Sequence, residues 1–420
     1  MRISRSVTIV CTAILIISAF PVRAATSFAA PAFKVQWQIG EAVAPNFWGP
    51  LSSARDGVNE PYKEAHGGQR IVQYYDKTRM ELTDPANGSV TNGLLTTELI
   101  TGKMQVGDSS FETRQPAQIN IAGDSGTDGP TYADLAPLPA LSPSVVNGGV
   151  LPIWHYAGSG RFDTLTYADP LSKPVKDALS FTQRSYLQDP GGRYGQHVFG
   201  PFETYLRGLL LPLDQTTGYA ITPFFIAQVK VGGVPTTVVA QAFERRVLTY
   251  NPNNPDAFKV EFGNIGLHYY QWRYPNGPAA ASMTQAPPPV SSDTSSDFRP
   301  FAERWGSHGF SLTVDGRGNG IALSRAYKSC NDNSSPPCDT FYNAMASLTF
   351  SRTDGVVAYG TVTQSVASSG FETGDDVSLT LLPYGMAVLS RHGAGPHPLC
   401  GPNYGRLAPA DLIKSGPCGA

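Results

Sequence analysis

The chain has 420 residues, of which 41% are hydrophobic and 15% charged, and its formal net charge is −2. This length and apolar content suit two or three folded domains and argue against a disordered or fibrous chain. The sequence has no basic run, which argues against nucleic acid and anionic membranes as partners. Its 43 glycines and 35 prolines predict many turns and little long helix.

Residues 1–24 have the pattern of a secretory signal peptide. They begin with Arg2 and Arg5, continue with an apolar stretch over residues 7–20, and end in Val22-Arg23-Ala24, which suits signal peptidase. An apolar stretch of about 14 residues is shorter than the roughly 20 that a membrane-spanning helix needs. We therefore expect a secreted protein, extracellular or at the cell surface, with no transmembrane span after cleavage. Loss of the three arginines would change its formal net charge from −2 to −5.

The body of the chain contains two stretches with the same kinds of residue in the same order. Each has a proline with an aromatic residue, a Gly-Gly pair, an apolar segment ending in an acid and a base, a turn with proline, and Gly-Leu. The first set is Pro61-Tyr62, Gly67-Gly68, residues 72–77, Pro85 and Gly93-Leu94; the second is Pro223-Phe224, Gly232-Gly233, residues 239–245, Pro252 and Gly266-Leu267. We interpret this as a diverged duplication with a period of about 170 residues. The predicted units are residues 33–122 and residues 123–275, the second including the inter-repeat segment.

These units are predicted to be rich in β-strands. Apolar and polar residues alternate over residues 72–82, which is typical of a half-buried strand or tight hairpin. The Gly-Gly pairs allow the chain to reverse, since glycine tolerates positive φ. The predicted fold is mainly β with a few short helices, in which duplicated β-rich units precede a small C-terminal barrel or sandwich.

Three segments of the second copy carry a resemblance to a known family. Residues 221–235, 241–250 and 266–272 resemble a family of uncharacterised secreted proteins from green non-sulfur bacteria, and the first copy resembles it more loosely. The order of turn, strand and Gly-Leu is similar to LGFP-type repeats, although only Trp48-Gly49-Pro50 and Phe199-Gly200-Pro201 echo the tetrapeptide. The resemblance implies association with the cell wall and supplies no catalytic residue.

Aromatic residues give the candidate binding site. Tyr269, Tyr270 and Trp272 lie close together, and with Trp48 they offer flat faces on which sugar rings could stack. The alternative is an aromatic strand that closes the core of the repeat. The acid-base pairs Asp76-Lys77 and Glu244-Arg245 admit two further interpretations: cross-strand ion pairs, or a glycan hydrolase with one carboxylate from each repeat.

Two short motifs resemble catalytic or metal-binding sequences but favour turns. Gly123-Asp124-Ser125-Gly126 is similar to the serine motif of chymotrypsin-like proteases, yet only His66 precedes it among histidines. Residues 315–320 have the outline of a calcium loop, but Arg317 puts a cation where an oxygen ligand is needed. We therefore predict no metal and no cofactor.

A linker and a C-terminal β domain complete the chain. Residues 276–297 are rich in proline, alanine and serine without apolar periodicity, which predicts a semi-stiff tether. Residues 298–420 are predicted to form a small β-barrel or sandwich, with strands over residues 305–323, 347–351, 356–364 and 377–382.

Four cysteines, all in this last domain, remain after removal of the leader. Cys330, Cys338, Cys400 and Cys418 predict two disulfides with three possible pairings, of which sequence proximity favours Cys330–Cys338 and Cys400–Cys418. A zinc site is disfavoured because its usual ligand spacing is missing. Residues 301–325 and 398–404 are similar to small disulfide-bonded domains of exported actinobacterial proteins.

Three hypotheses of function follow. The first is a noncatalytic surface protein that binds cell-wall or extracellular glycan, which the leader, the repeats and the aromatic residues favour. The second is a small-ligand or protein carrier that acts through the C-terminal β domain. The third is a carboxylate-dependent glycan hydrolase. The sequence leaves enzyme activity open and favours a protein without it.

Overall fold

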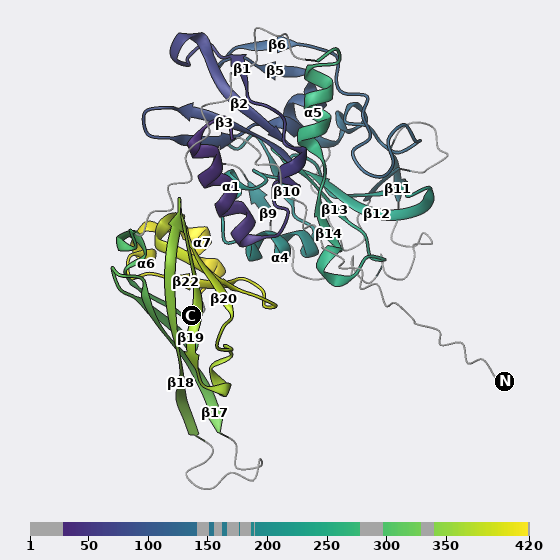
Figure 1. Ribbon diagram of the computed structural model, residues 1–420. Coiled ribbons are helices and arrows are strands. Elements are labelled where there is room, and N and C mark those ends of the chain that lie inside the picture. The colour runs from purple at the N-terminus through teal and green to yellow at the C-terminus, as the bar shows by residue number, and fades with distance from the viewer. Residues whose placement is uncertain are drawn as a thin grey trace, which may run out of the picture.

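The computed structural model describes most of the chain on both sides of the linker (Figure 1). The described residues are 28–140, 151–154, 162–165, 176, 186–188, 190–277, 297–328 and 340–418. The predicted signal peptide, linker residues 278–296 and the predicted Cys330–Cys338 disulfide lie outside them.

Residues before the linker form a β-rich body with short helices. Its strands are β1 (Val58–Pro61), β2 (Gln69–Tyr75), β3 (Thr78–Asp84), β4 (Ser89–Asn92), β5 (Lys103–Gln105), β6 (Phe111–Thr113), β7 (Leu151–Trp154), β8 (Asp163–Leu165), β9 (Tyr186–Gln188), β10 (Gly195–His197), β11 (Phe225–Val231), β12 (Val234–Ala242), β13 (Val247–Tyr250) and β14 (Val260–Phe262). Its helices include α1 (Pro31–Val43), α2 (Leu95–Thr101), α4 (Gly200–Gly208) and α5 (Ile265–Arg273).

The body contains two main sheets. One has the order β1-β2-β3-β4, and the other has the order β14-β13-β12-β11-β7-β8, in which β7 and β11 pair in parallel. The helices have local sequence causes: proline occupies the first turn of α1, where no backbone donor is lost, and Gly102 ends α2 at a φ of 70°.

The two sheets share one order of elements. Strands β1 to β4 followed by α2 correspond to β11 to β14 followed by α5, and the Gly-Gly pairs at residues 67–68 and 232–233 lie in the first turn of each set. All four of these glycines have positive φ. The acid-base pairs 76–77 and 244–245 both lie in the second turn, between β2 and β3 and between β12 and β13. They are therefore turn residues and not strand neighbours.

Each copy supports the other at this second turn. The backbone N–H of Leu267, in the first turn of α5, donates to the carbonyl of Asp76 (3.2 Å), and the N–H of Thr97, in the first turn of α2, donates to the carbonyl of Glu244 (3.3 Å). The Lys77 ammonium donates to the carbonyl of Phe262 at the end of β14 (2.6 Å). Reciprocal contacts of this kind join the two copies into one packed body.

The Arg245 guanidinium makes the matching contact from the second copy. It donates to the carbonyl of Asn92 at the end of β4, the position in the first copy that corresponds to Phe262. Each turn therefore supplies a cation that reaches the last strand of the other copy.

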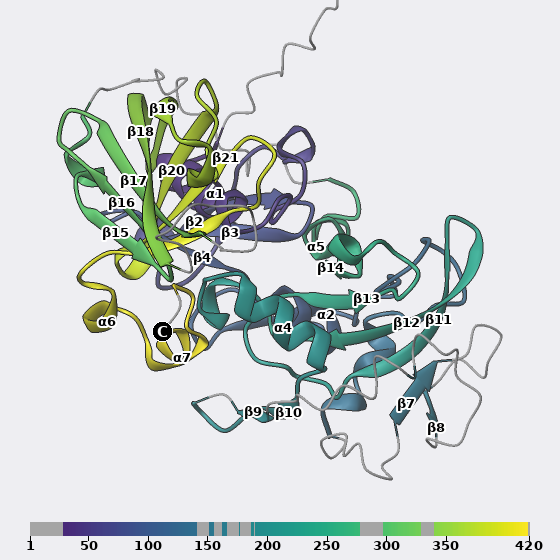
Figure 2. The ribbon, with the colours of Figure 1, turned by 90° about the horizontal axis from the view of Figure 1, so that it is seen from below.

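Residues after the linker form a closed antiparallel barrel (Figures 1 and 2). Its elements are β15 (Arg304–Ser307), β16 (Phe310–Val314), β17 (Asn319–Lys328), β18 (Thr340–Asp354), β19 (Val357–Ser365), β20 (Asp376–Leu382), β21 (Met386–Arg391), β22 (His397–Cys400), α6 (Tyr404–Leu407) and α7 (Ala410–Ser415). Each strand pairs with the next, and β22 pairs with β15 to close the barrel. The predicted fold class, mainly β with a C-terminal barrel, is confirmed.

The interior of the barrel is packed with apolar side chains. Small residues such as Ala322, Ala346 and Ala358 alternate along their strands with outward-facing positions, while Phe298 and Phe371 join the same cluster. An eight-stranded barrel has just enough interior space for side chains to fill it. Its core is therefore made of its own side chains.

Helix α1 lies between the body and the barrel and contacts strands β20 and β21 (Figure 2). The Lys34 ammonium pairs with the Asp354 carboxylate at 2.5 Å, and the Gln38 side chain donates to the Asp354 carbonyl at 3.0 Å. On β21 the side chains alternate, because Ala387 and Leu389 belong to the barrel core while Val388 joins the core of the body. Body and barrel therefore share apolar contacts.

Candidate functional site

Of the four predicted binding residues, two are buried and two are partly exposed. Trp48 and Tyr269 are fully buried, so neither can offer a ring face to an external ligand, and their prediction as surface binding residues is wrong. The indole N–H of Trp48 donates to the carbonyl of Trp37 at 3.1 Å, and its ring packs against Phe47 with a centroid distance of 4.5 Å. Trp48 is therefore a core residue that anchors the chain after α1.

Tyr270 and Trp272 remain partly exposed, on helix α5. The guanidinium of Arg55 lies 5.2 Å from the ring centre of Tyr270, and that of Arg114 lies 5.8 Å from the ring centre of Trp272. The strand predicted as the alternative is also incorrect, since a helical spacing of four residues buries Ile265, Tyr269 and Arg273 on one face.

The carboxylates of the hydrolase hypothesis serve the turns described above. Asp76 accepts a hydrogen bond from the Ser53 hydroxyl at 2.7 Å, and Glu244 accepts one from the backbone N–H of Tyr219 at 3.0 Å. Glu244 also pairs with Arg193 at 3.3 Å. These contacts are structural in character, and both acids lie in turns, so the cross-strand ion pairs that the sequence suggested do not fit these positions.

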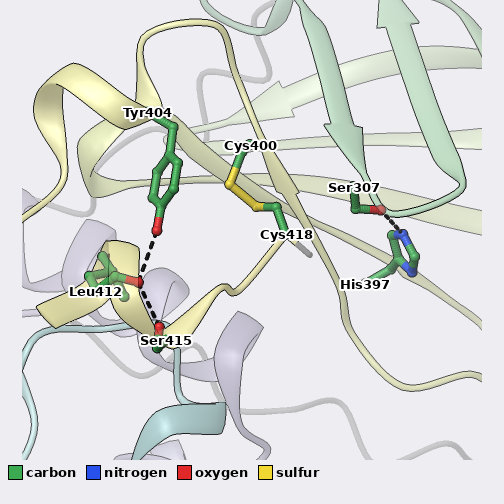
Figure 3. The surroundings of a disulfide bond; sticks show 7 residues. All are labelled: Ser307, His397, Cys400, Tyr404, Leu412, Ser415 and Cys418. Carbon is green, nitrogen blue, oxygen red and sulfur yellow. Dashed lines mark hydrogen bonds between the residues drawn. A yellow bond between two sulfur atoms is a disulfide. The ribbon is translucent and has the colours of Figure 1, made fainter. Parts of the chain in front are cut away.

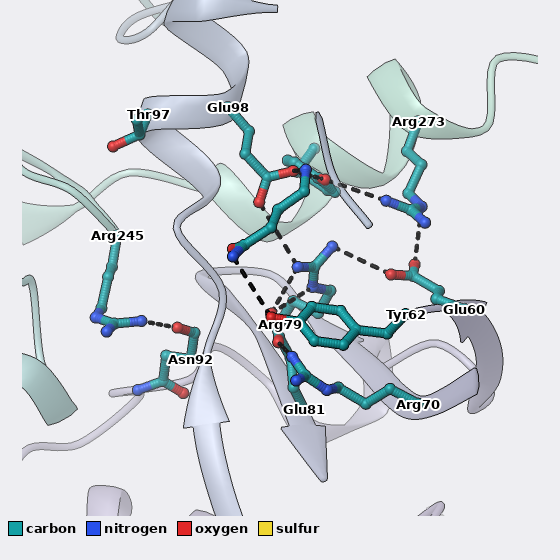
Figure 4. Close-up of polar contacts among 12 residues, drawn as sticks. Glu60, Tyr62, Arg70, Arg79, Glu81, Asn92, Thr97, Glu98, Arg245 and Arg273 are labelled. Carbon is teal, nitrogen blue, oxygen red and sulfur yellow. Dashed lines mark hydrogen bonds and ion pairs between the residues drawn. The ribbon is translucent and has the colours of Figure 1, made fainter. Parts of the chain in front are cut away.

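A network of buried ion pairs lies where α2 and α5 meet the first sheet (Figure 4). At its centre Arg79 on β3 contacts three carboxylates, those of Glu81 at 2.6 Å, Glu60 at 3.2 Å and Glu98 at 3.8 Å. The side chains of all four residues are less than a tenth exposed. Sequence analysis missed this network because these four residues come from three separate elements, β1, β3 and α2.

Two more arginines and three tyrosines complete the network. Arg70 pairs with Glu81 at 2.6 Å, and Arg273 on α5 pairs with Glu60 at 3.1 Å. The hydroxyl groups of Tyr74 and Tyr274 donate to Glu60 at 2.5 and 2.8 Å, and that of Tyr269 donates to Glu98. Three glutamates thus face three arginines, and the network is electrically balanced.

The three carboxylates do not have equivalent surroundings. Burial alone would raise the pKa of Glu81, but Arg79 and Arg70 outweigh it and hold that pKa below its usual value. Burial raises the pKa of Glu98, and Arg79 only partly offsets this effect. Two acids with divergent pKa values often mark a catalytic pair, yet both are enclosed and bound to arginine. We therefore interpret the network as structural. Through the ion pair of Arg273 with Glu60, it joins α5 of the second copy to the sheet of the first.

The two motif-like segments are turns, as predicted. The Asp124 carboxylate accepts hydrogen bonds from the backbone N–H groups of Gly232 (2.9 Å) and Gly233 (2.7 Å), and so fixes the β11–β12 turn. Asp315 accepts from the N–H groups of Arg317 (2.9 Å) and Asn319 (2.8 Å), in the turn between β16 and β17. Both carboxylates serve backbone geometry.

The cysteine pair at the end of the barrel is joined as predicted (Figure 3). Cys400 and Cys418 form a disulfide, with their Cα atoms 5.9 Å apart. The Ser307 side chain lies nearby and makes a hydrogen bond of 2.7 Å with Nε2 of His397, whose ring packs edge-on against Phe310. Burial and the positive charge of Arg391 lower the pKa of His397. No carboxylate among the described residues bonds the other ring nitrogen, so this pair lacks the orienting acid of a catalytic triad.

An apolar stripe on the outside of the barrel is the strongest candidate for a contact surface. It consists of Ile321, Leu323 and Tyr327 on β17 and Met345 on β18, with the exposed Arg325 between Leu323 and Tyr327 on the same face, and we call it the outer stripe. Ile321 is 50% exposed, Tyr327 54% and Met345 43%, and Leu323 lies directly opposite Met345 in the strand register. The hairpin of these strands extends from the barrel (Figure 1).

The sequence carried a signal for this stripe that could not be assigned to a face. Residues 319–328 alternate between bulky residues and the small residues Ala322 and Ala326. Alternation predicts a strand but does not say which set faces the core. In the barrel the small residues face inward, so the bulky ones lie outside.

The fold defines a protein with two packed β copies that support each other, followed by a closed eight-stranded barrel. No family model, no curated protein and no solved structure matches the chain. The resemblances stated from the sequence therefore stay predictions. In the described parts of the chain, no helix has the length and apolar character needed to cross a membrane. The same residues contain no group of three or more histidine, cysteine or acidic side chains that could hold a metal ion.

Proposed function

We propose that the chain is an exported, noncatalytic binding protein whose barrel contacts a protein partner at the cell surface through the outer stripe. The single observation that supports this proposal best is the gathering of exposed apolar side chains on two adjacent strands. Soluble proteins rarely leave contiguous apolar patches in water unless a partner covers them. The Cys400–Cys418 disulfide suits an oxidising compartment, which is consistent with export.

The composition of the outer stripe favours a protein partner over a sugar. Ile321, Leu323 and Met345 are aliphatic side chains, which pack well against apolar protein surfaces, and Tyr327 adds an aromatic residue of the kind enriched at interfaces. Sugar-binding platforms depend instead on flat rings. The ligand therefore differs from the one that the aromatic residues of α5 suggested.

The test is a binding assay with cell-wall preparations from the producing bacterium. The wild-type mature chain should sediment with the preparation, and Met345→Asp should weaken that binding at least about tenfold, because it places a charge in the centre of an apolar contact. Thr349→Asp is the matched control, since Thr349 is an exposed outward residue further along β18. Treatment of the preparation with protease should abolish binding. Wild-type protein that stays in the supernatant would contradict the proposal.

Glycan binding is the second candidate function, and partial exposure of Tyr270 and Trp272 favours it. In the same assay this alternative predicts binding that survives protease treatment. It also predicts that Trp272→Ala loses binding and that Met345→Asp binds as well as the wild type does. The two candidates therefore give opposite results with the same material.

A further inference from the structure

Arg246 is a buried cation without a carboxylate partner. It precedes β13 and is fully enclosed, with 0% of its surface exposed. Its Nη1 donates to the carbonyl of Phe47 at 2.8 Å. Its Nε and Nη2 have no hydrogen-bond partner, and no ion pair of the described residues includes it. This contrasts with Arg79, which contacts three carboxylates.

Aromatic rings surround the guanidinium. Its carbon lies 4.3 Å from the ring centre of Phe47, 4.3 Å from that of Phe262 and 5.1 Å from that of Trp48. Such rings stabilise a cation moderately, but they supply no acceptor for the two remaining donor groups. Enclosing a charged group while two of its donor atoms lack an acceptor is unfavourable.

A second cation lies in the same region. The Lys77 ammonium donates to the carbonyl of Phe262, and burial together with the charge of Arg246 lowers its pKa. Glu261 acts on Lys77 in the opposite direction, but its side chain is exposed and accepts a hydrogen bond from Asn254 at 3.4 Å. Asp76 also acts on Lys77 in this opposite direction, and its carboxylate accepts a hydrogen bond from Ser53. Neither acid forms an ion pair with Arg246 among the described residues.

The identity of the two unpartnered donors specifies the ligand. The N–H bonds of Nε and Nη2 lie along the same edge of the guanidinium and point in parallel. This edge matches the spacing of two oxygens in a carboxylate or a phosphate, which it binds with two hydrogen bonds. We propose that the Nε–Nη2 edge of Arg246, supported by the Lys77 ammonium, is a binding site for a small oxyanion.

The site would also join the two copies. Lys77 belongs to the second turn of the first copy and Arg246 to the second turn of the other, where Thr78 is the residue equivalent to Arg246. An anion bound between these cations neutralises charge that both copies contribute. Tyr205 on α4 lies in the same region, with its ring centre 5.5 Å from that of Phe262, and burial raises its pKa while Arg246 partly offsets that rise. This inference is independent of the outer stripe and of the function proposed for it.

The test measures thermal unfolding of the mature chain in acetate and in inorganic phosphate, each up to about 100 mM, with chloride used to keep ionic strength constant. A ligand that binds only the folded state raises the unfolding midpoint as its concentration increases. We expect a saturable rise for the wild type, at least about a tenfold weaker response for Arg246→Lys, which lacks the two-donor edge, and none for Arg246→Met. A response to acetate alone identifies a carboxylate ligand, and a response to phosphate alone identifies a phosphoryl ligand.

Arg207→Met is the matched control, because Arg207 lies on α4, is 55% exposed and pairs with Glu203. It should respond to anions as the wild type does. A direct measurement on the wild type is the NMR signal of the Arg246 Nε–H group, which should shift on titration with the same anions. An unfolding midpoint that neither anion changes, or an equal response in Arg246→Met, would overturn the proposal.

Discussion

At the scale of single residues, burial decides which groups carry charge. Arg79 and the three glutamates around it are enclosed but matched, whereas Arg246 is enclosed among rings. His268 on α5 is largely enclosed but carries no charge near neutral pH, because burial lowers its pKa to about 4. Burial also raises the pKa of Tyr132, so that its hydroxyl keeps its proton, and this hydroxyl shares a hydrogen bond of 2.9 Å with Nδ1 of His268.

The low pKa of His268 predicts a stability that depends on pH. Between about pH 6.5 and pH 4 the unfolded chain binds a proton at this histidine that the folded chain does not bind. The free energy of unfolding should therefore fall as the pH is lowered through this range, by about 1.4 kcal/mol per pH unit from this residue alone. Chemical denaturation at a series of pH values would measure it. The slope should decrease in His268→Gln, while the exposed His66→Gln should keep the wild-type slope.

If both variants have the same slope as the wild type, His268 is not the group responsible. Glu98 works in the opposite direction, since its raised pKa means that the folded state favours the protonated acid. Its contribution declines as the pH rises through the folded pKa. Comparison of slopes between variants separates the two residues, whereas the wild-type curve alone does not.

At the scale of elements, close contact between α5 and the β2–β3 turn decides how the copies fit. A Cβ at position 266 would overlap the carbonyl oxygens of Tyr75 and Thr78, so only glycine allows this approach. The backbone N–H of Gly266 donates to the carbonyl of Asp76 at 3.0 Å. The contact thus holds the first turn of a helix against a turn of the other copy.

The variant Gly266→Ala should lower the free energy of unfolding by about 3 kcal/mol, since an added methyl group in a packed contact forces the backbone apart. Gly208→Ala provides the control: Gly208 ends α4, and a Cβ there meets nothing within 4 Å. That change should be neutral or stabilise the protein by up to about 1 kcal/mol. Denaturant titration measures both, and equal effects would refute the role given to Gly266.

Many of these elements could be predicted from the sequence, and others could not, for physical reasons. Alternation and turn chemistry predicted the barrel strands from β15 to β20 and the turn at Asp315, because both are local signals, but they did not predict β21 and β22. Sequence reasoning misplaced Trp48 and Tyr269, since an aromatic residue suits a ligand platform and a core equally well. It could not find Arg79 or Arg246, because what distinguishes them is the neighbours that folding brings from distant segments.

At the scale of the whole molecule, the barrel is attached to the body by a shared apolar contact. Val388 is fully buried and faces the body while its neighbours in sequence face the barrel core. Lys34 and Gln38 add polar contacts with Asp354. This arrangement predicts that the two parts unfold together.

Val388→Asp should separate the two parts. A carboxylate without a partner in this contact costs about 3 kcal/mol or more, but it leaves the barrel core unchanged. Calorimetry should show one transition for the wild type and two for the variant, while Thr349→Asp, at an exposed outward position, should keep one. A single transition in Val388→Asp at a lower temperature would mean that the residue supports the fold of the barrel itself.

The reciprocal support of the two copies has a consequence for how the chain gains its structure. Thr97 and Glu244 are 147 positions apart, and Lys77 and Phe262 are 185 apart. Contacts between such distant segments form slowly, because a large loop must close before they contribute. In the export that residues 1–24 predict, the first copy would cross the membrane before the segments that support it. Its folding would then wait until nearly the whole body has crossed.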